Sequence, residues 1–95
     1  MAELTLKTFE PLVGDAFVIR AADGAIDAVL TEAASAGDAN GAPREPFSLV
    51  WRGPLDAPLQ QGLHQVEHPS LEPEVMFLVP IGRTADGLDY QAIFN

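Results

Sequence analysis

The chain has 95 residues, 47% of them hydrophobic, with a formal net charge of −9 and no cysteine. Its length suits a single domain over residues 1–95, and without cysteine it forms no disulfide, thiolate nucleophile or thiolate metal site. The five Lys and Arg residues are scattered, which excludes the clustered positive charge that nucleic acids and anionic membranes require.

The chain also shows no targeting or membrane segment. Its first residues lack the basic and long apolar regions of a secretory signal. The longest apolar run, residues 75–82, is far shorter than the ~20 residues of a membrane helix. We therefore expect a soluble, cytoplasmic protein with no membrane partner.

The N-terminal segment predicts one short helix over residues 6–12. Thr5 suits the N-cap, Pro11 limits the helix to about two turns, and Gly14 suits its exit.

A hairpin is predicted next. Residues 17–20 alternate as a strand does, and Asp23-Gly24 is typical of a two-residue hairpin turn. Residues 25–35 fit either a strand or a helix, because their apolar residues also recur at helical spacing. The turn that precedes them favours the strand.

The middle of the chain predicts one strand between two irregular segments. Residues 36–46 lack periodicity and are rich in small residues, so we predict a surface loop. Residues 47–52 alternate, and Trp51 falls on the apolar face of the strand, where we expect it in the core. Residues 53–62 begin and end with Gly and contain two Pro residues, which predicts a break.

The last third predicts three strands. Residues 63–68 form a strand with both His residues on one face, and residues 69–73 turn the chain. Residues 74–81 are apolar at both parities, so we expect a strand covered on both sides. After a turn at residues 83–87, residues 88–95 alternate as a final strand.

Short strands separated by Gly, Pro and Asp turns indicate an all-β fold. We expect about six antiparallel strands in a small sandwich or partly open barrel, with one short N-terminal helix.

The pair Glu67-His68 is the first candidate site. His64 and His68 project from one face of a strand roughly 13 Å apart, so that strand alone cannot bring both onto one ion. Glu67 points to the opposite face. A structural role is the simpler interpretation, and metal binding or catalysis at His68 is the alternative.

Other polar residues give no enzyme signature. Glu72 and Glu74 fall in a predicted turn, where a carboxyl stays solvated rather than poised as an acid. The Ser residues lack a G-x-S-x-G context, and the Gly spacing fits no phosphate-binding loop. We predict no catalytic residue, no metal and no cofactor.

Arg52 and the aromatic residues are binding candidates. Arg52 ends an apolar strand, where it forms either a rim ion pair or an anchor for a partner's carboxylate. Trp51 is an interface anchor if it is not core, and with Tyr90 it would line the mouth of a ligand-binding barrel.

Three motifs resemble a known family: "REPFSLVWRGP", "QGLHQVEHPSLEPEVMFLVPIG" and "DGLDYQAIFN". They are similar to a family of small bacterial proteins classed as a domain of unknown function, the DUF6916 type. Trp51 and His64 stand where the family pattern has Phe and Tyr, and Pro73 where it has a residue near Gly. The resemblance implies a packing role for position 64, no defined activity, and an association with tail-fibre or collar-like proteins.

Our first hypothesis is a non-enzymatic protein-binding or assembly module that associates with a protein partner or with itself. It is accessory to a phage-tail-like or surface fibre protein, and a free sheet edge offers one means of binding. The alternatives are a small hydrolase or metal-dependent enzyme centred on His68, Glu67 and Arg52, and a barrel that binds a small molecule.

Overall fold

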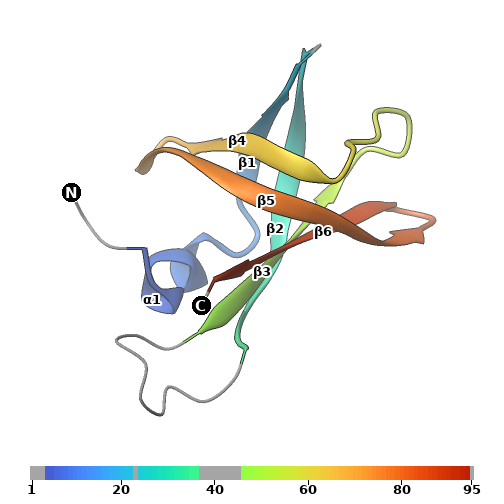
Figure 1. Cartoon of the computed structure of the whole chain (residues 1–95). Coiled ribbons are helices and arrows are strands. Elements are labelled where there is room, and N and C mark those ends of the chain that lie inside the picture. Colours follow the sequence, from blue (N-terminus) through green and yellow to red (C-terminus); the bar gives the residue numbers. More distant parts are fainter. Residues whose placement is uncertain (1–3, 23, 37–45, 95) are drawn as a thin grey trace.

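The computed structural model describes residues 4–22, 24–36 and 46–94, which form six strands and one short helical segment (Figure 1). The elements are α1 (Leu6–Phe9), the 3-10 turn η1 (Glu10–Leu12), β1 (Ala16–Ala21), β2 (Gly24–Ser35), β3 (Phe47–Gly53), β4 (Gly62–His68), β5 (Leu71–Thr84) and β6 (Gly87–Phe94). The predicted all-β fold with a short N-terminal helix is confirmed.

The strands close into a barrel in the order β1-β2-β3-β6-β5-β4, and every neighbouring pair is antiparallel. The long strand β5 pairs with β4 up to Leu78 and with β6 from Val79 onward. As a result β4 and β5 run steeply across β1 and β2 (Figure 1). Every described strand therefore has a neighbour on each side and none is an edge strand, but Leu71–Leu78 of β5 pairs only with β4.

The ambiguous segment after the first hairpin is strand β2, as the turn signal favoured. Its register pairs Ala21 of β1 with Gly24, and its alternation buries Ala28 and Leu30. Gly24, predicted as part of the hairpin turn, is therefore the first residue of β2, and Asp23 lies outside the described residues. Most of the loop predicted over residues 36–46 also lies outside them, and so does Asn95.

The N-terminal helix is anchored at one end of the barrel. Thr5 donates its backbone N–H to Thr8 Oγ1, and Gly14 leaves the helical segment at a φ of 96° and donates to the Leu30 carbonyl at 2.7 Å. Phe9 is fully buried, with its ring centroid 5.9 Å from that of Phe47. Helix α1 therefore contributes an aromatic side chain to the core.

The core is a single cluster drawn from the inward residues of the strands. The fully buried large side chains are Trp51, Tyr90, Phe9, Phe17, Phe47, Ile19, Leu30, Leu49 and Leu78. Trp51 packs edge-on to Phe17 with centroids 5.6 Å apart, which confirms its predicted place in the core. Phe94 stacks on Phe47 at 4.7 Å, so the last strand completes the same cluster.

Two predictions about β5 are wrong. The turn is shorter than residues 69–73, because β5 begins at Leu71 and carries Glu72 and Pro73 within the strand. The strand is also not covered on both sides: Met76 and Leu78 are buried, while Val75 is 62% and Phe77 51% exposed. Among the described residues, no helix is long and apolar enough to cross a membrane.

Candidate functional site

His68 has a structural role at the end of β4. Its side chain is 7% exposed and its ring centroid lies 4.8 Å from that of Phe17. Nδ1 accepts the Ser70 backbone N–H at 3.0 Å, so the ring proton is on Nε2, which donates to Asp15 Oδ2 at 3.0 Å. Both ring nitrogens are therefore occupied, and neither is available to a metal ion or a substrate proton.

Glu67 lies on the opposite, outer face of β4, as the alternation predicted. Its carboxylate accepts hydrogen bonds from Nε and Nη2 of Arg20 on β1 and from the Gln65 side chain. These bonds, with Arg20 the main cause, lower the pKa of Glu67. The carboxylate is thus held ionised in an ion pair that joins β4 to β1, the opposite of what a general acid needs.

His64 does not join His68 in a shared site. Its Nε2 donates to the Gln60 carbonyl at 2.7 Å, and its Nδ1 lies 3.3 Å from the Arg20 carbonyl. Across residues 4–22, 24–36 and 46–94, no three His, Cys, Asp or Glu side chains are grouped so that they could hold a metal ion. His64 therefore fastens the loop before β4 to the end of β1.

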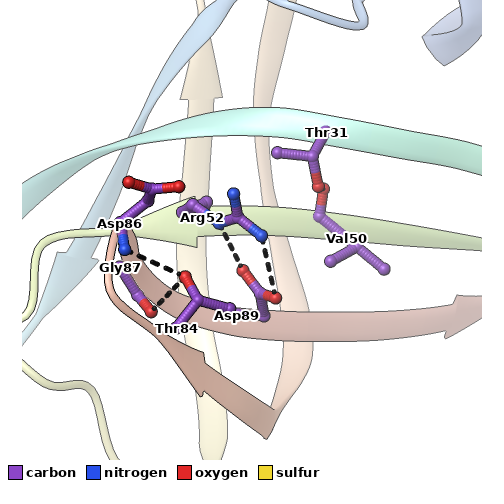
Figure 2. Close-up of polar contacts among 7 residues, drawn as sticks. All are labelled: Thr31, Val50, Arg52, Thr84, Asp86, Gly87 and Asp89. Atoms are coloured by element: carbon purple, nitrogen blue, oxygen red, sulfur yellow. Dashed lines mark hydrogen bonds and ion pairs between the residues drawn. The ribbon is translucent and has the colours of Figure 1, made fainter.

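Arg52 forms the rim ion pair rather than standing alone (Figure 2). Its Nε and Nη2 donate to the two carboxylate oxygens of Asp89, its cross-strand neighbour on β6, at 2.9 and 3.3 Å. The bonds to Asp89 raise the pKa of Arg52. A partner's carboxylate would have to share or displace this bidentate contact, so Arg52 is a less suitable anchor than the sequence suggested.

Trp51 and Tyr90 are cross-strand neighbours on β3 and β6, and both side chains point into the barrel. They are 0% and 1% exposed, and the Tyr90 hydroxyl accepts the backbone N–H of buried Leu59 at 2.9 Å. Leu59 belongs to the segment between β3 and β4, which covers this end of the core. A small molecule would reach the two rings only after that segment moved.

A shallow hollow lies beside His68. It has a volume of about 440 Å³, and its lining includes Phe17, Leu71 and Pro73 together with the acidic residues Asp27 and Glu67. Since His68 and Glu67 are held by other partners, the hollow offers an apolar wall but no converging catalytic groups.

The feature that sequence reasoning missed is an uncharged outer face where β4, β5 and β6 meet. Three cross-strand pairs define this neutral face: Leu63 with Phe77, Gln65 with Val75, and Val79 with Gln91. Leu63 is 70%, Val75 62% and Phe77 51% exposed. The signal was the apolar run at both parities, which we interpreted as a strand covered on both faces.

The fold and these contacts define a small closed antiparallel barrel whose polar side chains connect neighbouring strands. The chain belongs to the family described as a domain of unknown function, DUF6916, whose profile matches residues 4–94. The resemblance in the three sequence motifs is thereby confirmed. No curated protein and no solved structure matches the chain.

Proposed function

We propose that this protein is a non-enzymatic binding or assembly module that acts through the neutral face. The observation that carries the proposal is the exposure of Leu63, Val75 and Phe77 on adjacent strands. A contiguous patch of exposed apolar side chains on a folded domain is often a contact surface for another molecule. The chain has a net charge of −9, yet this outer face carries no charged side chain. Because charged residues are depleted at the centre of protein interfaces, such a face is suited to burial against a partner.

The state of the polar candidates supports a binding role over a catalytic one. His68 uses both ring nitrogens, and Glu67 and Arg52 are each engaged in a bidentate ion pair. An active site needs groups that converge on a substrate with a free donor, acceptor or nucleophile. Each of these groups instead stabilises contact between two parts of the barrel.

We also propose that the module is accessory to a structural protein, with a phage-tail-like or surface fibre protein as the candidate that the family resemblance implies. The closed barrel bears on the binding mode. Because none of the described strands is an edge strand, we expect the molecule bound there to pack against side chains of the neutral face rather than add a strand.

Site-specific photo-cross-linking in the source cells tests the proposal. A benzophenone amino acid replaces Phe77 on the neutral face, and in a matched control it replaces Val29, which is 40% exposed on β2. We expect an adduct of defined mass from position 77 that is absent from position 29, with its protein identified by mass spectrometry. No adduct at position 77, or the same adducts at both positions, would refute the proposed binding role.

A further inference from the structure

We propose that the neutral face is a self-association surface, and that its occupant is the same face of a second copy related by a two-fold axis. The inference rests on the proposed function and names the partner of that same face. Two outer sheet faces would stack about 10 Å apart, with Leu63 and Phe77 at the centre of the contact.

The placement of charge at the borders of the face favours a second copy. At one border, Glu67 lies two residues beyond Gln65 on β4 and is neutralised by Arg20. At the other border, Asp89 lies two residues before Gln91 on β6 and is neutralised by Arg52. The carboxylates of Glu67 and Asp89 are therefore compensated within one chain.

This arrangement matters because two copies of a chain with a net charge of −9 repel each other at long range. Contact through the neutral face brings together no like charges, whereas a contact through Asp27 or Glu32 on β2 would. A strongly basic or acidic partner, in turn, would find no unpaired charge on the neutral face to recognise.

The size of the face sets the expected strength. Leu63, Val75 and Phe77 are each at least half exposed, so each has a solvent-accessible area on the order of 100 Å². The whole neutral face therefore has an accessible area of about 400 Å². A stable complex buries about 800 Å² per partner, so we expect a weak dimer with a dissociation constant of roughly 10 µM or higher.

Sedimentation velocity of the full chain tests the inference over about 5 µM to 1 mM. We expect the wild-type sedimentation coefficient to rise with concentration toward that of a dimer. Phe77→Glu should weaken association at least tenfold by placing a carboxylate at the centre of each copy's face. The matched control Val13→Glu adds the same charge at the exposed end of η1 and should associate as the wild type does.

A charge-complementation experiment separates loss of contact from loss of folding. Phe77→Glu and Phe77→Lys should each be monomeric and folded by circular dichroism, and an equimolar mixture should associate more strongly than either alone. A wild type that stays monomeric at about 1 mM, or a Phe77→Glu variant that still dimerises, would overturn self-association. A monomeric wild type whose position 77 cross-links to a different protein would overturn this inference while supporting the proposed function.

Discussion

Gly87 is the position where the structure makes the sharpest stability prediction. It opens β6 directly after the turn from β5, beside the Arg52–Asp89 ion pair (Figure 2). An added Cβ would lie 2.7 Å from Arg52 Cγ and even closer to the Gly53 backbone oxygen. The Arg52 side chain has room to adjust, but the Gly53 carbonyl belongs to the paired strand β3 and moves only if β3 and β6 separate.

The cost follows from this contact and not from backbone conformation, because Gly87 is not among the described residues with positive φ. Overpacking that forces backbone shifts costs about 1–3 kcal/mol, and we expect Gly87→Ala to lose about 2 kcal/mol of unfolding free energy. Gly82 provides the matched control in the same hairpin, since its added Cβ would meet nothing within 4 Å and its φ is also not positive. Gly82→Ala should stay within about 0.5 kcal/mol of the wild type.

Urea unfolding followed by fluorescence measures both variants, because Trp51 is the one Trp of the chain and is fully buried. For a domain of this length, the loss in Gly87→Ala corresponds to a midpoint temperature roughly 10 °C lower. The reasoning is refuted if Gly87→Ala unfolds at the wild-type urea concentration, or if Gly82→Ala loses as much stability as Gly87→Ala does.

Three further predictions concern the candidate site residues. Trp51→Phe should cost less than about 1 kcal/mol of unfolding free energy, because the loss of one ring is offset by removal of a buried indole N–H that has no acceptor among the described residues. Trp51→Ala should cost about 3–5 kcal/mol. A cost above about 3 kcal/mol for Trp51→Phe, measured by urea unfolding followed by circular dichroism, would contradict this. Arg20 lowers the pKa of Glu67, so the ion pair stabilises the fold above the ordinary pKa of a carboxyl and its contribution fades as the pH falls through the lowered value. Glu67→Gln should therefore melt below the wild type at pH 7 and together with it in strong acid, and a gap that persists in acid would argue against the pair. His68→Ala should lose about 2 kcal/mol of unfolding free energy, because it removes the hydrogen bonds to Asp15 and Ser70. Elemental analysis should find no stoichiometric metal in the wild type or in the variant. A metal present in the wild type and lost in the variant would reverse our assignment of His68.

Sequence periodicity was sufficient for the strands but not for their closure. The alternation in β3 and β6 places Trp51 and Tyr90 inside because each strand has one face toward a single core. Closure depends on the pairing of β1 with β4, which involves three residue pairs between Val18–Arg20 and Gln65–Glu67. No local pattern encodes a pairing between segments so far apart, so a sandwich and a barrel could not be distinguished from the sequence.

The short turn before β5 has a local explanation that the sequence did not reveal. The register between β4 and β5 shifts between Val66 and His68, which marks a bulge at Glu72 and Pro73 of β5, opposite Glu67. A bulge is one of the few places where a strand accepts Pro, since a ladder hydrogen bond is already missing there. Pro73 therefore lies within β5, where pairing is irregular, and does not end the strand.

The neutral face could have been anticipated from the size of the chain. Six strands that close into one barrel have one interior, and their alternate residues already fill it. The remaining described segments do not form a second layer: helix α1 places Phe9 against Phe47 inside the core. Apolar residues of β5 whose side chains point away from the barrel interior, such as Val75 and Phe77, are therefore exposed to solvent in the isolated chain. Val75 and Phe77 are therefore exposed on the outer side of the barrel, where our proposed contact with another molecule would cover them.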